Sequence, residues 1–543
     1  MSLLSLGGIS MLFLRVVDPA LCIVLLIGSG MSLMRAAKRA AWQSAAALAA
    51  TVMLGLLLAV GVCPSRVGDI SIHVFPGRIT QYGASIEALL ATLGLLVPPS
   101  DDVIAGINVV AGAGTLVAVF AMTRLLGARP RVAHTAALLF AVIPANLRFI
   151  FTFERYPLFL FTMFSGFSLL LAFLSERRRR DLIAAVAAFT LAVQCRPEGF
   201  MATLLGGALL FACADRIAAL DRASKRALFL AICTHLALTA VPLAVMVVSD
   251  MGQVGATYLW PSQGANASVR FRIWEPDRNV FLNRAYTPLA WPLFAAVGLV
   301  FDPCVNWRLR AWVLLSAAAL TALLANYPVS GAFVGTDYQL SNARYFLASL
   351  PFYCFLSASG LHGVVEFLVR RLRATAWNLS ELAAHLVAPM ALASLAALPA
   401  RGVLRDTTAD QEYRFLQRSL RSVPEGCTLV TIDPWNDRGL RPPILLGEAV
   451  RRNQKWRLEH DAPNSGAQSG EEQCAALYLP ANCYVGPPVD EAHPWSPEKI
   501  CAEFAARAGP AIAQAEIANA PFRGEKYRGE TLKIGVYWMK RPD

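Results

Sequence analysis

The chain has 543 residues, of which 56% are hydrophobic and only 16% are charged. Soluble domains contain roughly 25% charged residues, so this chain is too apolar to be wholly soluble, and a membrane protein is the class that fits. The net charge is +12, but residues 401–543 hold 19 basic and 19 acidic residues, so the whole surplus lies in the first 400. There it clusters in short loops, as in membrane proteins, which argues against a nucleic-acid partner.

Apolar runs that could cross a membrane recur along these 400 residues. A helix needs about 20 residues to cross a hydrocarbon layer of about 30 Å. The sequence predicts about twelve spans, and the short ones within 181–216 are the weakest of them. The predicted spans are 16–34, 41–62, 103–123, 132–151, 156–174, 181–195, 199–216, 226–248, 287–303, 311–327, 344–364 and 381–399.

Basic clusters occupy alternate loops between the spans. Because cytoplasmic loops carry an excess of Lys and Arg, the side that holds these clusters is predicted to be cytoplasmic. The N-terminus and the residues after 400 are then expected outside, in the periplasm of a bacterium, on a multi-pass protein of the inner membrane. The clusters are Arg35/Lys38/Arg39, Arg124/Arg129/Arg131, Arg177 to Arg180, Arg222/Lys225/Arg226, Arg308/Arg310 and Arg370/Arg371/Arg373.

After Pro399 the composition becomes that of a soluble domain. The segments EYRFLQRSL and SPEKICAEFAARA predict helices, while CTLVTI, AALYL and KIGVYW predict strands, which together indicate a small α/β domain. Disulfides persist on the oxidising outer side. The first choice is Cys483 with Cys501, which would close the Pro-rich loop between them, and the second is Cys427 with Cys474.

Two carboxylates fall at outer boundaries of the predicted spans. Asp69 follows the span 41–62 in the segment VGDISIH, and a carboxylate there could act as a general base on an acceptor hydroxyl or amine. Glu154 lies in a short outer turn, where it could orient the acceptor or help to hold Mg²⁺ or Mn²⁺. The structural alternatives are a loop Asp that caps a turn and a local ion pair between Glu154 and Arg155.

Two arginines at outer boundaries suit a phosphate group. Arg196 opens the turn Arg-Pro-Glu-Gly, which includes Glu198, and Arg344 precedes Tyr345 at the start of a late span. The planar guanidinium fork binds phosphate in a bidentate manner. The structural alternatives are a tight turn with a snorkelling Arg196, and an ion pair between Arg344 and Asp337.

The outer loop 259–291 interleaves aromatic and basic residues. Trp260 and Trp274 could stack on sugar rings, while Arg270 and Arg272 suit a lipid-linked phosphate. An aromatic belt at the membrane interface with snorkelling Arg is the plainer interpretation of this pattern.

The predicted spans and the charged outer loops, in their order along the chain, resemble those of the GT-C glycosyltransferases. These enzymes use polyprenyl-phosphate-linked sugars and include the aminoarabinose transferase of lipid A and the protein O-mannosyltransferases. The resemblance covers roughly residues 41–399. It rests on Asp69 with the apolar stretch 84–98, the Gly- and Ala-rich spans that end in FTFERYP, the turn CRPEGF and the segment NARYFLASLP. The first loop has Gly68-Asp69-Ile70 where many members show adjacent acidic residues.

The resemblance implies an α-helical GT-C-like membrane protein of about twelve transmembrane helices with a C-terminal periplasmic α/β domain. Residues 1–40 are then an extra span, 41–399 the catalytic domain and 400–543 the soluble domain.

The same resemblance implies inverting transfer of a sugar from a polyprenyl-phosphate donor to a lipid, glycan or protein acceptor on the outer leaflet. Asp69 would deprotonate the acceptor, and Arg196 and Arg344 would stabilise the departing lipid phosphate. No cofactor is required, and a divalent cation at Asp69 and Glu154 is an option. We expect acceptor or sugar contacts from the side chains of His73, Glu198, Trp260, Trp274, Asp337 and Tyr345.

Three other functions remain open at this point. A flippase or transporter for a lipid-linked saccharide would show inverted repeats and broken helices, and the sequence shows neither clearly. A ligase with a pyrophosphate-linked donor would use His73 or an arginine as its key group. A non-catalytic assembly protein would use the outer domain to bind a partner.

Overall fold

The computed structural model resolves the chain into two compact units. The first, which is helical, comprises Met1–Cys63, Gly77–Pro328 and Ala343–Gly402, and the second comprises Pro64–Pro76, Val329–Asn342 and Val403–Asp543. The residues that it describes are 16–17, 19–25, 27–28, 42–62, 101–149, 156–195, 199–249, 291–301, 305–325, 347–374, 387–395, 408–432, 456–459, 474–479, 502, 504–518 and 531–539.

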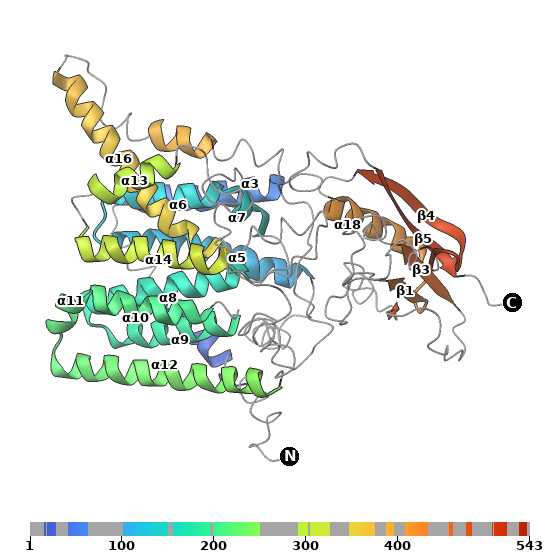
Figure 1. The fold of residues 1–543 in the computed structure, drawn as a ribbon, viewed down its shortest axis with the longest axis horizontal. Helices are drawn as coiled ribbons and strands as arrows, with labels where there is room; N and C mark the ends of the chain where they lie inside the picture. Colours follow the sequence, from blue (N-terminus) through green and yellow to red (C-terminus); the bar gives the residue numbers. More distant parts are fainter. Residues whose placement is uncertain are drawn as a thin grey trace, which may run out of the picture. The chain divides into compact units, whose positions relative to one another are not determined.

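The first unit is a bundle of apolar helices (Figure 1). Four of the described helices are long and apolar enough to cross a membrane, namely Gly106–Leu125, Tyr156–Glu176, Arg222–Val241 and Leu350–Arg371, which indicates a multi-pass membrane protein. The helices are α3 (Trp42–Val62), α5 (Asp101–Leu125), α6 (Pro130–Val142), α7 (Pro144–Phe149), α8 (Tyr156–Glu176), α9 (Arg179–Cys195), α10 (Phe200–Ala212), α11 (Ala214–Ala218), α12 (Arg222–Ser249), α13 (Trp291–Phe301), α14 (Trp307–Ala325) and α16 (Leu350–Ala374).

The span predicted at 132–151 was wrong as a single helix, because the structure divides it into α6 and α7. The break falls at Ile143, whose φ of −59° and ψ of 126° lie outside the helical region. Pro144 explains the break, since proline offers no N–H and its ring disfavours helical backbone at the residue before it. The span predicted at 199–216 also divides, into α10 and α11, at Cys213, whose φ is −97° and ψ is 20°.

Aromatic rings fill the centre of the bundle. The ring of Phe167 on α8 lies 5.3 Å from the rings of both Phe189 on α9 and Trp312 on α14, and 6.1 Å from Phe352 on α16. The pairs with Phe189, Trp312 and Phe352 are edge-on, the arrangement that ring quadrupoles favour. This cluster joins the consecutive helices α8 and α9 to α14 and α16, which come more than 100 residues later in the chain.

A buried histidine ties α12 to its neighbours. The Nδ1 of His235 lies 3.0 Å from the Thr190 hydroxyl of α9, and its Nε2 lies 2.9 Å from the Thr203 hydroxyl of α10. Both ring nitrogens are therefore paired, as a buried imidazole requires.

The second unit is an α/β domain. Its five-stranded sheet has the order β2-β1-β3-β5-β4, in which β1 runs parallel to β2 and β3, while β5 runs antiparallel to β3 and β4. Side chains of α18, including Leu416, pack on one face of the sheet and Phe504 packs on the other. The elements are α18 (Thr408–Ser419), the 3₁₀ turn η6 (Leu420–Ser422), β1 (Thr428–Ile432), β2 (Trp456–Glu459), β3 (Ala475–Leu479), β4 (Ala508–Ala518) and β5 (Thr531–Met539).

A disulfide links the starts of the neighbouring parallel strands β1 and β3. Cys427 directly precedes β1, Cys474 directly precedes β3, and their sulfurs are bonded. This is the pairing that the sequence placed second. The first choice, Cys483 with Cys501, lies outside the described residues.

Candidate functional site

The bundle has one strongly basic end. The Arg308 guanidinium, at the start of α14, lies 3.0 Å from the Asp215 carboxylate on α11, and Arg177 after α8 donates to the carbonyl of Ala219, 2.9 Å away. Arg216 lies 3.4 Å from the carbonyl of Leu125, the last residue of α5. We call this the basic end; it lies on the left of Figure 1. The described basic clusters therefore share one end, as the positive-inside rule predicts.

Several cations at the basic end neutralise helix termini. Lys225 donates to the carbonyl of Ala218 at 2.9 Å, and Arg310 donates to that of Leu299 at 3.2 Å. Such carbonyls have no partner within their helix, and a cation beside them also complements the helix dipole. At the start of α12, Asp221 accepts a hydrogen bond from the Ser224 backbone N–H, and hydrogen bonding by Ser224 lowers the pKa of the Asp221 carboxyl below its ordinary value.

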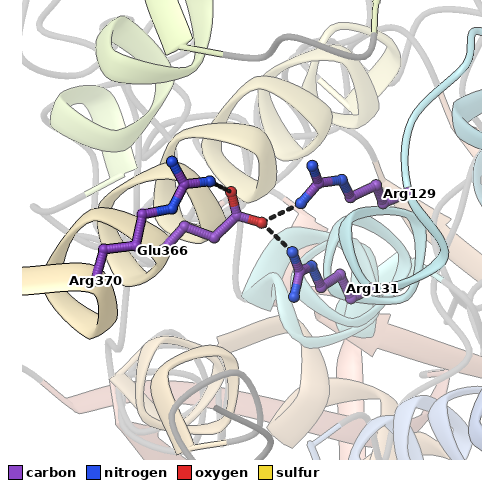
Figure 2. A network of polar contacts seen from close by, with 4 residues as sticks. All are labelled: Arg129, Arg131, Glu366 and Arg370. Atoms are coloured by element: carbon purple, nitrogen blue, oxygen red, sulfur yellow. Dashed lines mark hydrogen bonds and ion pairs between the residues drawn. The ribbon is translucent and has the colours of Figure 1, made fainter. Parts of the chain in front are cut away.

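A four-residue ion-pair network joins α6 to α16 at the basic end (Figure 2). One carboxylate oxygen of Glu366 accepts hydrogen bonds from Arg129 and Arg131, and its other oxygen lies 3.7 Å from Arg370. The Glu366 side chain is 20% exposed, whereas that of Arg370 is 79% exposed. Because one carboxylate separates three guanidinium groups that would repel one another, this network has an evident structural role.

The starts of α8 and α10 and the end of α9 lie at the end of the bundle opposite the basic end (Figure 1). Glu154 falls between the end of α7 and the start of α8, and Arg196 and Glu198 fall between the end of α9 and the start of α10. Arg344 and Tyr345 precede α16, and Asp69 and His73 follow α3.

The predicted site residues themselves lie outside the described part of the chain, so their contacts stay predictions. These residues are Asp69, His73, Glu154, Arg196, Glu198, Trp260, Arg270, Arg272, Trp274, Asp337, Arg344 and Tyr345.

Gly199, the first described residue after Arg196, packs tightly against the end of α9. A Cβ atom on Gly199 would lie 2.0 Å from the carbonyl oxygen of Ala192 and 2.6 Å from the Cα of Val193. Only glycine fits so close to another backbone. The start of α10 therefore packs directly on the last turn of α9.

Sequence reasoning missed several buried polar groups, among them Gln194 and Trp291. Gln194, in the last turn of α9, is 2% exposed, and Trp291, at the start of α13, is 1% exposed. Among the described residues, neither the Gln194 amide nor the Trp291 indole N–H has a hydrogen-bond partner. Their only sequence signal is a polar group at the edge of an apolar helix, which is costly in a membrane and often functional.

The described residues include no group of three His, Cys, Asp or Glu side chains that could hold a metal ion. The carboxylates predicted to hold a divalent cation, Asp69 and Glu154, are outside the described residues.

Solved structures share this fold over nearly the whole chain. The match to ArnT from Cupriavidus metallidurans bound to undecaprenyl phosphate has a TM-score of 0.53 and 13% identity, and it covers 92% of this chain and 98% of that chain. The apo state of the same ArnT gives 0.52 and 12%, with 90% and 97% covered. The chain has a GT-C-like fold.

The predicted resemblance is thereby confirmed at the level of the GT-C-like fold. A weaker match is the archaeal oligosaccharyltransferase AglB from Archaeoglobus fulgidus, in complex with an inhibitory peptide and a dolichol-phosphate, with a TM-score of 0.42 and 14% identity. It covers 76% of this chain, and this chain spans 64% of that protein. No family model and no curated protein matches the sequence.

Proposed function

We propose that this chain is an inverting glycosyltransferase that moves a sugar from a polyprenyl-phosphate donor to an acceptor on the outer face of the cytoplasmic membrane. The observation that carries this proposal is the GT-C-like fold, matched over 98% of an ArnT whose structure holds undecaprenyl phosphate. The order of charged residues along the chain supports it independently, since the predicted site residues flank helix ends opposite the basic end.

The proposed chemistry needs one base and a set of cations. Asp69 accepts the proton of an acceptor hydroxyl or amine, and the freed electron pair attacks the anomeric carbon from the face opposite the phosphate. The bond from that carbon to the phosphate oxygen breaks, and the lipid phosphate leaves with the electron pair. Arg196 and Arg344 stabilise the charge that develops on it, with support from Arg270 and Arg272.

Other residues are assigned to the sugar and the acceptor. Glu154 orients the acceptor or shares a divalent cation with Asp69, since hard cations prefer oxygen ligands. Contacts to the acceptor or the sugar come from His73, Glu198, Trp260, Trp274, Asp337 and Tyr345.

The proposed topology follows from the basic end. If that end is cytoplasmic, the opposite end faces the outer leaflet, where a lipid-bound donor can enter sideways from the bilayer. Residues 400–543 are then periplasmic, and 41–399 form the catalytic domain.

Reconstitution in vesicles tests the proposal. Purified protein is given candidate polyprenyl-phosphate sugars and acceptors, and transfer is compared for the wild type, Asp69→Asn and Glu154→Gln. Asp215→Asn, which changes an exposed carboxylate at the basic end, is the matched control. We expect Asp69→Asn to abolish transfer in folded protein while the control retains it.

Two results contradict the assignment. Full turnover by both Asp69→Asn and Glu154→Gln removes the proposed base, and movement of the sugar lipid across the vesicle membrane without transfer favours a flippase.

A further inference from the structure

Gln194 is buried in the bundle without a polar partner. Its side chain lies one residue before the end of α9 and is 2% exposed. Within the described residues, neither its Oε1 nor its Nε2 makes a hydrogen bond. An unpaired amide in an apolar interior costs free energy that an apolar side chain of the same length would not cost.

Nearby polar groups are already occupied by one another. Thr190, one turn before Gln194 on the same helix, is bonded to the Nδ1 of His235, and the Nε2 of that histidine is bonded to Thr203. The polar groups of Thr190, His235 and Thr203 are thus paired with one another, while the amide of Gln194 has no partner among the described residues.

The backbone beside Gln194 is closely packed. The backbone at Gly199 lies so close to Ala192 that a Cβ atom there would be 2.0 Å from the Ala192 carbonyl oxygen. The last turn of α9 is thus held from the side of α10. A polar group that is costly, buried and held in place is the arrangement expected of a binding residue.

We infer that Gln194 binds a hydroxyl group of the sugar that the lipid donor carries. An amide both donates and accepts hydrogen bonds, and so does a sugar hydroxyl. A phosphate oxygen only accepts, so a phosphate would leave the Oε1 of Gln194 unpaired. This inference rests on the proposed function, and it assigns to that site a residue which recognises the sugar rather than the phosphate.

The first test measures stability without any ligand. Gln194→Met keeps the length of the side chain and removes its polar atoms, so the melting temperature of purified protein is expected to rise by roughly 1–2 °C. Thr123→Val is the matched control, because Thr123 on α5 is fully buried at the basic end and its hydroxyl also has no partner among the described residues. Gln194→Leu is a second apolar variant for the case that Met packs badly.

The second test measures binding of two probes, undecaprenyl phosphate and undecaprenyl phosphate mannose, with the glucose form as a further sugar-bearing probe. The wild type is expected to bind one sugar-bearing probe more tightly than the bare lipid phosphate. In Gln194→Met this excess should fall by about tenfold, while affinity for undecaprenyl phosphate is unchanged. The Thr123→Val variant should be more stable than the wild type, and it should prefer the sugar-bearing probe over undecaprenyl phosphate as strongly as the wild type does.

The outcomes separate the inference from the proposed function. If Gln194→Met and Gln194→Leu both lower the melting temperature, the amide has partners inside the protein and the inference is overturned. It is also overturned if the excess survives in Gln194→Met. If the wild type binds neither kind of probe, the proposed function fails, and the sugar assignment fails with it.

Discussion

The contact between α13 and α16 depends on two glycines that bring the helix backbones together. A Cβ atom on Gly360 would lie 1.8 Å from the carbonyl oxygen of Phe294 and 2.7 Å from the backbone nitrogen of Gly298. An ordinary contact begins at 3.4 Å, so Gly360→Ala must move the helices apart by about 1.5 Å. Overpacking costs typically 1–3 kcal/mol, and a backbone atom cannot rotate away, so we expect a loss of about 3 kcal/mol in the free energy of unfolding.

Gly207 on α10 offers the matched control, because no heavy atom lies within 4 Å of a Cβ placed there. Alanine is a better helix former than glycine by about 0.8–1.0 kcal/mol, so Gly207→Ala should be neutral or stabilising. Thermal unfolding of both variants in detergent, followed by circular dichroism, measures the difference. Equal melting temperatures for the two variants would refute the close approach of α13 and α16.

Three further predictions concern other contacts. The bond between Cys427 and Cys474 closes a separation of 47 residues, so Cys427→Ala should cost the α/β unit about 4 kcal/mol in denaturant unfolding. Glu366→Gln should lower the free energy of unfolding by about 2 kcal/mol, a value between those of exposed and buried ion pairs. In 1 M salt, where the screening length is about 3 Å, the variant should regain part of its melting temperature, because salt screens the repulsion among the three arginines. His235→Leu should cost about 2–3 kcal/mol in thermal unfolding, because the buried hydroxyl of Thr190 and the half-buried hydroxyl of Thr203 lose their partner. Adding Thr190→Val should recover part of that loss.

The helices of the bundle were predictable because an apolar run in a membrane has few alternatives to a helix. The ends of these helices were harder to predict. The span predicted at 344–364 continues to Ala374 in α16. The charges of Glu366 and Arg370 suggested a loop, but the helix continues because Glu366 pairs with Arg129, Arg131 and Arg370. Such pairing depends on residues more than 200 positions away, which no local pattern contains.

The sheet of the second unit was predictable in part. The strands β1, β3 and β5 follow apolar segments rich in residues that favour strands. The sequence analysis missed β2 and β4, and it missed β4 because alanine disfavours strands and Pro510 interrupts the segment. The structure explains both features: β4 is an edge strand, and its pairing with β5 is irregular between Ala508 and Ala513.

The sequence predicted the order of charged residues along the chain, but it could not predict which buried side chains contact one another. Counting charges along the chain correctly predicted that the described basic clusters share one end. No count of residues could single out Gln194, because a sequence does not show whether a buried amide finds a hydrogen-bond partner. Being unpartnered is a property of the packed bundle rather than of the residue.

The position of α16 connects the basic end with the proposed site. The helix is held near its far end by Glu366 and at mid-length by Gly360, while its first residue, Leu350, follows the proposed phosphate ligand Arg344 by six positions. From Gly360 to Leu350 the helix rises about 15 Å, and a packed helix shifts as a unit. A displacement of 1 Å at a reacting centre can cost about a hundredfold in rate. Gly360→Ala should therefore lower kcat for sugar transfer by at least about tenfold well below its melting temperature, whereas a kcat equal to that of Gly207→Ala would show that Arg344 is not positioned through α16.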